Sequence, residues 1–195
     1  MPEIPLELFM DGLKKLIELD KDFIPKHAGS SLYIRPFMIG TEPFIGVRTS
    51  DRYIFSIITG PTASYYDEAI SVLVYDSYVR STKGGYGNAK AAGNYAGTLY
   101  PVEVAKQKGY KDVLWLDGEH KKYLNEVGTM NIFLVIDGKL VTPEIDGTIL
   151  DGITRNSIIT IAKDLGYEVE ERPISIDEVI EAYNNKTLTE MFGTG

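Results

Sequence analysis

The residues from Gly84 to Tyr95 contain the side chain of this sequence that is best suited to covalent chemistry. They read Gly-Gly-Tyr-Gly-Asn-Ala-Lys-Ala-Ala-Gly-Asn-Tyr, so three glycines, which permit positive φ and close backbone approach, lead to Lys90 with an alanine on each side. A lysine among small residues can be partly desolvated, which favours the free amine that attacks a carbonyl to form a Schiff base. Lys90 is therefore a candidate catalytic residue, although a surface loop with a solvated lysine would show the same residue types.

Other glycine-rich motifs and metal sites do not match this sequence. A P-loop requires Ser or Thr directly after Gly-Lys, and the dinucleotide fingerprint requires a third glycine at the position of Lys90. His27 and His120 lie far apart and lack acidic ligands at metal-binding spacing, so we expect no metal. The sequence has no cysteine, which excludes a thiolate nucleophile and suits a reducing compartment.

The composition is that of an acidic globular protein. The chain has 195 residues, 44% of them hydrophobic, which suffices for one sizeable domain or two small ones. Its 20 basic and 28 acidic residues give a formal charge of −8, which offers no electrostatic support for a nucleic acid or an anionic membrane as partner. No apolar run is long enough to span a bilayer, and the acidic start lacks the features of a signal peptide, so we expect a cytoplasmic protein.

The elements before the glycine loop are predicted to be one helix and two strands. Apolar residues at helical spacing indicate an amphipathic helix from about residue 6 to residue 19. Residues 32–39 are β-branched and aromatic, and Pro36 among them indicates an edge strand or a bulge. A second strand, residues 53–59, is followed by Gly60-Pro61-Thr62, which we interpret as a turn at the start of a linker.

The elements after residue 69 predict a mixed α/β architecture. Asp137-Gly138 between two apolar runs is typical of a hairpin with a two-residue turn. The predicted elements are a buried strand at 70–75, a helix at 94–108 that is kinked or restarted by Pro101 and ends at Gly109, a strand at 113–116, hairpin strands at 131–136 and 139–142, a helix from the N-cap Thr154 to Gly166, an edge strand at 167–172, a helix that begins with the capping box of Ser175 and Glu178, and a final strand at 190–192.

Seven motifs follow one another in an order that is specific to one family. They are Asp20-Lys-Asp-Phe-Ile-Pro25, Leu32-Tyr-Ile-Arg-Pro36, Gly84 to Tyr95, Val113-Leu-Trp-Leu116, Asn125-Glu-Val-Gly-Thr-Met-Asn131, Leu150-Asp-Gly-Ile-Thr-Arg155 and Glu190-Met-Phe-Gly193. In these motifs the chain resembles the fold-type IV, pyridoxal-phosphate-dependent aminotransferases, and among them the branched-chain amino-acid aminotransferases. Full-length members are longer at both ends, so we expect an internal fragment that is inactive or weakly active by itself.

The resemblance assigns roles around the cofactor to three side chains. Lys90 matches the lysine that binds the cofactor covalently and then moves a proton to and from the substrate Cα. Tyr95 resembles the tyrosine that hydrogen-bonds the cofactor's phenolic oxygen, although a core tyrosine beside Leu99 is the simpler interpretation of its position. Glu126 resembles the acid that keeps the pyridine nitrogen protonated; without the resemblance it would be a surface glutamate.

A second group of residues matches the phosphate side of the cofactor. The backbone amides of Ile153 and Thr154 and the Thr154 side chain match a phosphate-binding turn, which agrees with the helix start that the sequence itself predicts there. Thr154 as a plain N-cap would look the same. Arg80 is a weaker match to the neighbourhood of the cofactor, and a solvated arginine is the alternative.

The substrate side of the family's site corresponds to residues from two segments. Tyr33 and Arg35 stand two apart on a strand and so share one face, and Arg35 is suited to the second carboxylate of glutamate. Thr129 matches the same side. Ile45 and Val47 correspond to a hydrophobic lid over the partner subunit's site, which implies a homodimer; ordinary packing of two apolar residues is the alternative.

The resemblance implies a transaminase that moves the amino group of leucine, isoleucine or valine to 2-oxoglutarate, with pyridoxal 5'-phosphate as cofactor and small amino and 2-oxo acids as its partners. It divides the chain into part of a small α/β domain at residues 1–60, a linker at 61–66 and a larger domain at 67–195, with a mixed sheet or pseudo-barrel and flanking helices. Other fold-type IV enzymes, namely D-amino-acid aminotransferase or aminodeoxychorismate lyase, and a non-catalytic folded domain remain as alternatives.

Overall fold

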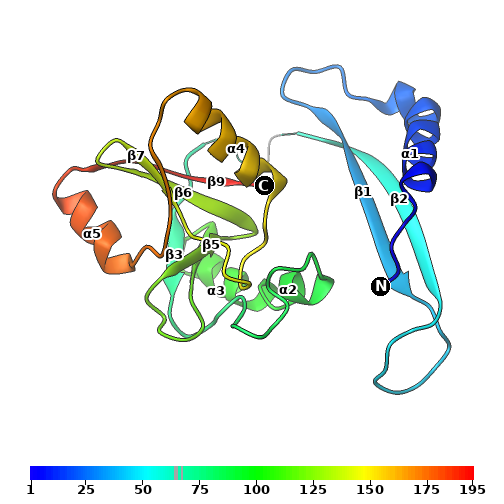
Figure 1. The fold of residues 1–195 in the computed structure, drawn as a ribbon, viewed down its shortest axis with the longest axis horizontal. Coiled ribbons are helices and arrows are strands. Elements are labelled where there is room, and N and C mark those ends of the chain that lie inside the picture. Colours follow the sequence, from blue (N-terminus) through cyan, green and yellow to red (C-terminus); the bar gives the residue numbers. More distant parts are fainter. Residues whose placement is uncertain (64–65, 67) are drawn as a thin grey trace. The chain divides into compact units, whose positions relative to one another are not determined.

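The computed structural model describes residues 1–63, 66 and 68–195 and divides into two compact units, Met1–Glu68 and Ala69–Gly195 (Figure 1). Among the residues that the structure describes, no helix combines the length and the apolar character that a membrane crossing requires.

The first unit is a helix packed on a two-stranded antiparallel ribbon. Its elements are α1 (Leu6–Asp20), the 3-10 turn η1 (Lys21–Phe23), β1 (Ser31–Gly40) and β2 (Tyr53–Thr62). The α1 helix contacts β2 through Phe9, whose ring centroid lies 5.9 Å from that of Phe55. None of the described residues of this unit is fully buried. The element bounds confirm the predicted helix and both predicted strands. The lack of buried residues in the described part of this unit shows that these elements do not enclose a core of their own.

One detail of the ribbon agrees with the prediction and another differs: of the two predicted alternatives at Pro36, an edge strand or a bulge, the structure shows the edge strand. Pro36 pairs with Ile57 in an unbroken register, so it causes no bulge; each strand of a two-stranded ribbon is an edge strand, which tolerates a missing N–H. The prediction of a turn at Gly60-Pro61-Thr62 was wrong, because these residues continue β2 and face residues 31–33 of β1. Of the predicted linker 61–66, residues 64 and 65 lie outside the described residues, and the two units meet after Glu68. The assignment of the units to a small domain and a cofactor domain stays a prediction.

The second unit is built on a seven-stranded mixed sheet, which confirms the mixed α/β fold class. The strand order is β3-β4-β5-β6-β7-β8, and β9 pairs with β6; β3 with β4 and β7 with β8 are parallel, and the other pairs are antiparallel. The strands are β3 (Val72–Tyr75), β4 (Asp112–Leu116), β5 (Leu124–Val127), β6 (Met130–Ile136), β7 (Lys139–Thr142), β8 (Val169–Glu171) and β9 (Leu188–Thr194). Strand β5 was not predicted.

The hairpin of β6 and β7 follows from its turn residues. Asp137 and Gly138 have φ values of 51° and 77°, the left-handed pair that a type I′ turn requires and that matches the twist of the strands. The predicted hairpin is confirmed. The predicted acidic edge strand is also confirmed, because β8 is the last strand of the sheet order.

The helices of the second unit are α2 (Ala92–Ala96), α3 (Leu99–Gln107), α4 (Ile153–Asp164) and α5 (Ile176–Asn184). The predicted helix restart is confirmed, and Pro101 lies in the first turn of α3, where its missing N–H has no helical partner to lose. Ser175 caps α5 as predicted, since its hydroxyl accepts a hydrogen bond of 3.1 Å from the Glu178 N–H. The N-cap of α4 is Gly152 and not Thr154, because the helix begins two residues earlier than predicted.

The core lies on both faces of the sheet because neighbouring residues of its inner strands point in opposite directions. On β4, Leu114 and Leu116 pack on the α5 side, whereas Val113 and Trp115 pack against Ala105 of α3. Phe133 of β6 faces α4, whose Ile159 and Ala162 join the same cluster. The first strand of this sheet is not buried as predicted: β3 is an edge strand and Val74 is exposed.

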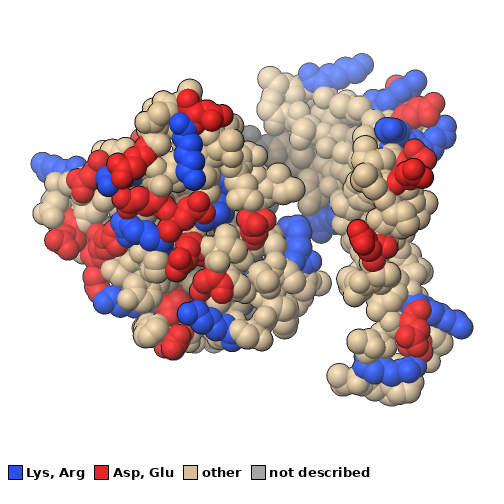
Figure 2. All heavy atoms as spheres, in the orientation of Figure 1, with Lys and Arg blue, Asp and Glu red and all other residues tan. Residues whose placement is uncertain are grey.

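Charged side chains of both signs are interspersed over the face of the second unit that Figure 2 shows. Several of them form ion pairs. Arg172, for example, lies 2.9 Å from Glu170 and 2.6 Å from Glu178. The charges of this unit are thus arranged as local pairs, which is the usual pattern of a solvated surface.

Candidate active site

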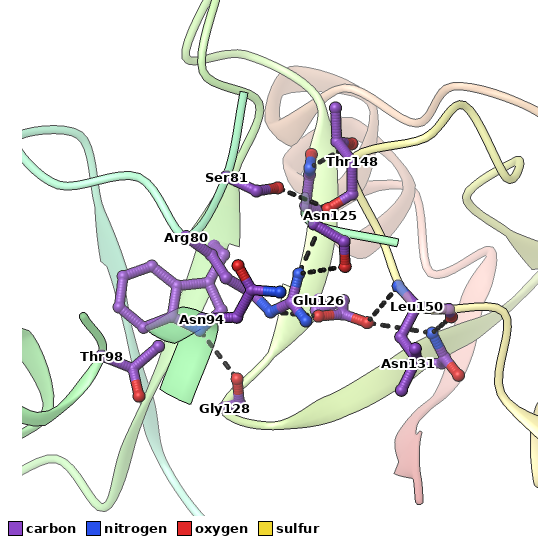
Figure 3. A network of polar contacts seen from close by, with 12 residues as sticks. Arg80, Ser81, Asn94, Thr98, Asn125, Glu126, Gly128, Asn131, Thr148 and Leu150 are labelled. Carbon is purple, nitrogen blue, oxygen red and sulfur yellow. Dashed lines mark hydrogen bonds and ion pairs between the residues drawn. The ribbon is translucent and has the colours of Figure 1, made fainter. Parts of the chain in front are cut away.

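A buried carboxylate, Glu126 on β5, lies at the centre of a polar network (Figure 3). Its side chain is 2% exposed, so it is not the surface glutamate that the sequence without the family resemblance would suggest. Its Oε1 accepts hydrogen bonds from Asn131 Nδ2 at 3.1 Å and from the Leu150 N–H at 3.2 Å. Its Oε2 lies 2.5 Å from Arg80 Nε. The network therefore joins β5, β6, the segment after β3 and the turn before α4.

The charge state of Glu126 is balanced between opposing effects. Burial raises the pKa of the carboxyl to about 7, although the positive charge of Arg80, the Leu150 N–H and the positive charge of Lys90 all act to lower it. Because the charge of Lys90 acts on Glu126, the two predicted site residues share one electrostatic environment. A carboxyl with this pKa exchanges its proton near neutral pH, as acid–base groups of active sites do.

Two buried oxygens of this region lack a hydrogen-bond partner among the described residues, Glu126 Oε2 and Thr194 Oγ1. Arg80 Nε is the ion-pair partner of Oε2. Glu126 faces Asn131 across β5 and β6, and Asn131 faces Thr194 across β6 and β9. Opposed residues of antiparallel strands share a face, so both oxygens lie on one side of the sheet. Buried acceptors of this kind normally have a donor, which a bound group could supply here.

The predicted catalytic lysine forms a pair with the predicted tyrosine. Lys90 Nζ donates a hydrogen bond of 3.0 Å to the Tyr95 hydroxyl, which accepts it. The loop that carries Lys90 is held by Asn94, whose Nδ2 donates to the carbonyls of Tyr86 at 2.8 Å and Ala89 at 2.9 Å. Leu99 is 71% exposed, so Tyr95 is not part of a buried face with it as the core interpretation required. Lys90 is exposed, so its small neighbours do not desolvate it in this chain.

The glycine loop touches the turn before α4 through Gly87. A Cβ atom at Gly87 would lie 2.1 Å from the Thr148 carbonyl oxygen and 2.6 Å from Ser81 Oγ, far inside van der Waals contact. Gly84 contributes differently, because it adopts a φ of 78°. Glycine is therefore required at two positions of this loop, once for close approach and once for backbone conformation.

Arg80 is buried, with 4% of its side chain exposed, so the alternative of a solvated arginine is wrong. Its Nη1 donates to the carbonyls of Gly87 at 3.4 Å and Thr148 at 3.2 Å. The hydroxyl of Ser81 also donates to the Thr148 carbonyl. Arg80 thus lies beside Glu126 and between the Lys90 loop and the turn before α4.

The start of α4 is attached to the same network. Ile153 and Thr154 are the first residues of the helix, where backbone N–H groups have no helical acceptor. A Cβ at the N-cap Gly152 would lie 2.2 Å from Asn131 Oδ1, and Asn131 Nδ2 donates to the Leu150 carbonyl at 2.9 Å as well as to Glu126. The free N–H groups and the positive end of the helix dipole are therefore anchored to Glu126 through Asn131 and Leu150.

Comparison with known proteins decides what this arrangement belongs to. The sequence profile of the family described as amino-transferase class IV matches residues 2–188. The chain belongs to the class IV aminotransferase family.

Three similar proteins of known name place the chain within this family. Branched-chain-amino-acid aminotransferase 2 of Bacillus subtilis is 54% identical over 198 residues, which cover all of this chain and 54% of that protein. The crystal structure of Escherichia coli branched-chain amino acid aminotransferase matches with a TM-score of 0.80 and 28% identity, over 100% of this chain and 60% of that one. An aminotransferase from Brucella abortus bound to the co-factor PLP matches with a TM-score of 0.76 and 26% identity, over 97% and 62%. The chain spans about half the length of the curated relatives it matches.

The remaining predicted residues of this class IV aminotransferase lie outside the Glu126 network. Thr129 is exposed in the turn between β5 and β6. Tyr33 and Arg35 share a face of β1 as predicted, and Arg35 Nη2 donates to the Tyr33 hydroxyl at 3.0 Å. Ile45 and Val47 are fully exposed, so ordinary packing does not explain them in this chain. Four of these residues belong to the first unit, and their role toward the substrate stays a prediction.

Several polar residues of the site were not predicted from the sequence, namely Ser81, Asn94, Asn131, Thr148 and Thr194. One signal was available: Asn131 directly precedes the apolar run Ile-Phe-Leu-Val, and a polar residue next to a buried strand needs partners.

Two hollows of the second unit, each of about 310 Å³, lie away from these residues. One is lined by apolar residues of α4 and the β6–β7 hairpin, the other by charged residues around Arg172. Neither lining includes Lys90 or Glu126. A cofactor site needs convergent polar groups, so we expect it at Glu126 and not at the apolar hollow.

Proposed function

We propose that this class IV aminotransferase is a branched-chain amino-acid transaminase, which uses pyridoxal 5'-phosphate to move the amino group of leucine, isoleucine or valine to 2-oxoglutarate. The names of the similar proteins from Bacillus subtilis and Escherichia coli support this substrate class. The observation that carries the proposal is the buried Glu126 carboxylate, whose Oε2 has no hydrogen-bond partner among the described residues and which shares its environment with Lys90.

The residues present fit pyridoxal phosphate. A protonated pyridine nitrogen is a charged donor, and Glu126 Oε2 is a buried acceptor without a donor. An anionic phosphate suits the free N–H groups of Ile153 and Thr154 at the start of α4. When bound, the cofactor supplies a conjugated ring that accepts the electron pair released at the Cα of the amino acid.

Each residue of the site then has a definite task. Lys90 would hold the cofactor through its Nζ and would carry the proton to and from the substrate Cα. Tyr95 holds the Lys90 amine through the 3.0 Å hydrogen bond of its hydroxyl. Glu126 would hold a proton at the pyridine nitrogen, and Asn131 and the Leu150 N–H fix the orientation of its carboxylate.

We assign the substrate side to Tyr33, Arg35, Thr129, Ile45 and Val47. The Arg35 guanidinium is suited to two-pronged binding of the second carboxylate of glutamate. Ile45 and Val47, two fully exposed apolar side chains, would cover the branched side chain in a partner's site, which requires a homodimer.

The absence of cysteine suits a reducing compartment, and we place the protein in the cytoplasm.

Amino-donor specificity tests the proposal. Purified protein with pyridoxal phosphate is assayed with 2-oxoglutarate and either L-leucine or D-alanine, and separately for pyruvate release from aminodeoxychorismate. We expect glutamate formation with L-leucine only, and at a low rate when the chain is tested by itself, because it spans about half the length of its relatives. Turnover of D-alanine or of aminodeoxychorismate, with none of leucine, would assign the chain to another fold-type IV activity, and a protein that binds no cofactor would be a non-catalytic domain.

A further inference from the structure

We propose that Arg80 is a positioning residue: it joins Glu126, the Lys90 loop and the turn before α4 into one rigid arrangement and acts on the reaction only through Glu126. This inference rests on the proposed function, because it gives Arg80 a role in the same site. It differs from a direct contact between Arg80 and the cofactor.

The contacts of Arg80 go to three separate segments. Its Nε lies 2.5 Å from Glu126 Oε2 on β5. Its Nη1 donates to the Gly87 carbonyl in the Lys90 loop at 3.4 Å and to the Thr148 carbonyl before α4 at 3.2 Å. One planar guanidinium with several donors in fixed positions is suited to hold three segments at once, whereas the donors of a lysine rotate freely.

These contacts close a ring around the carboxylate. Thr148 leads to Leu150, whose N–H donates to Glu126 Oε1 at 3.2 Å, while Arg80 holds Oε2 from the other side (Figure 3). Gly87 lies directly against the Thr148 carbonyl, so the Lys90 loop cannot shift without moving the same turn. Loss of Arg80 should therefore loosen both oxygens of Glu126, although Arg80 contacts only one.

Arg80 also determines the charge that Glu126 carries. Burial favours the protonated carboxyl, and the positive charge of Arg80 is the largest effect that lowers its pKa, followed by the Leu150 N–H and the charge of Lys90. The acidic group of the same turn is Asp146, which accepts hydrogen bonds from the backbone and hydroxyl of Thr148. Without Arg80, Lys90 is the remaining cation that acts on Glu126. A neighbouring opposite charge such as that of Arg80 lowers a carboxyl pKa by about 1 to 3 pH units, so the loss of Arg80 should raise the pKa of Glu126 by a similar amount.

The test uses the protein without cofactor first. Arg80→Met keeps most of the side-chain length but removes charge and donors, Arg80→Lys keeps the charge, and Arg172→Met is the control, because Arg172 is paired with Glu170 and Glu178 outside this network. Carbon-13 NMR gives the pKa of Glu126, and hydrogen exchange gives the protection of the Leu150 N–H. We expect Arg80→Met to raise the pKa by about 1 to 3 pH units and to lower the protection of Leu150. Arg80→Lys should restore the pKa but not the protection, and Arg172→Met should change neither.

The second step compares pyridoxal phosphate with its 1-deaza analogue, in which carbon replaces the ring nitrogen. If Arg80 acts through Glu126, Arg80→Met should reduce the preference for pyridoxal phosphate over the analogue at pH values between the wild-type and the raised pKa, where Glu126 loses its charge in the variant only. It should have little further effect when Glu126 is already glutamine, since the two residues would act as one unit.

The outcomes separate this inference from the proposed function. An unchanged Glu126 pKa and unchanged Leu150 protection in Arg80→Met would overturn the role of Arg80, whatever the protein binds. An additive loss of affinity in the Arg80→Met, Glu126→Gln double variant would also overturn it, because it would indicate a direct contact with the cofactor. If the pKa and the protection depend on Arg80 but the wild-type protein binds no pyridoxal phosphate, the positioning of Glu126 stands and the proposed function is wrong.

Discussion

The close approach at Gly87 predicts a large effect for a single methyl group. In Gly87→Ala the new Cβ would lie 2.1 Å from the Thr148 carbonyl oxygen, so the loop or the turn must move by more than 1 Å to reach about 3.3 Å, an ordinary carbon–oxygen contact. Overpacking of this kind costs about 1 to 3 kcal/mol. The shift also strains the hydrogen bonds that Arg80 and Ser81 donate to the same carbonyl, which adds about 1 to 2 kcal/mol.

We therefore expect Gly87→Ala to lower the free energy of unfolding by about 3 kcal/mol. Gly97→Ala is the matched control, since Gly97 has helical φ and a Cβ there would find its nearest neighbour at 3.6 Å, an ordinary contact. Urea unfolding can be followed by the fluorescence of Trp115, the single tryptophan, which is completely buried. Equal stability of Gly87→Ala and Gly97→Ala would refute the packing of the Lys90 loop against the turn before α4.

Three further predictions concern pH and helix capping. Burial would raise the pKa of Asp117, but hydrogen bonds from four backbone N–H groups outweigh it and lower this pKa to about 2. The contribution of Asp117 to stability is therefore complete above its unfolded pKa near 3.8 and is lost as the pH falls through about 2. In acid-unfolding curves Asp117→Asn should be less stable than wild type at pH 5, and the difference in stability should close toward pH 2. Burial raises the pKa of Glu126 to about 7, so wild-type stability is lost as the pH rises and not as it falls. Glu126→Gln should therefore gain stability relative to wild type as the pH rises from about 4.5 to 7. A stability difference that does not depend on pH would count against a buried, titrating carboxyl. Ser175→Ala removes the N-cap of α5 and should cost about 1 kcal/mol in urea unfolding, whereas Ser157→Ala, whose hydroxyl donates to a carbonyl within α4, should cost less.

The elements with strong local signals were predicted from the sequence. The Asp137-Gly138 hairpin and the Ser175 cap are decided by a few neighbouring residues, and the structure confirms both. The end of β2 was placed wrongly because Gly60-Pro61-Thr62 has turn-like composition, whereas pairing with β1 keeps these residues extended. Strand β5 was missed because Asn125 and Glu126 give it no apolar alternation.

The candidate site shows the same division between local and distant information. Lys90 and Tyr95 were both identified from one local motif, and the structure adds a hydrogen bond of 3.0 Å between them. The burial of Arg80 against Glu126 depends on two segments that are far apart in the chain, and no pattern near either residue indicates it. Polar networks between distant segments become visible only once the strand order is known.

The most direct test of the account is to find the lysine that binds the cofactor. The protein is mixed with pyridoxal phosphate, reduced with borohydride and digested, and the modified peptide is identified by mass spectrometry. The account predicts a phosphopyridoxyl group on Lys90 that persists in Lys83→Ala, the neighbouring lysine of the same loop, and disappears in Lys90→Ala. An unmodified Lys90, or modification spread evenly over the lysines of the chain, would contradict it.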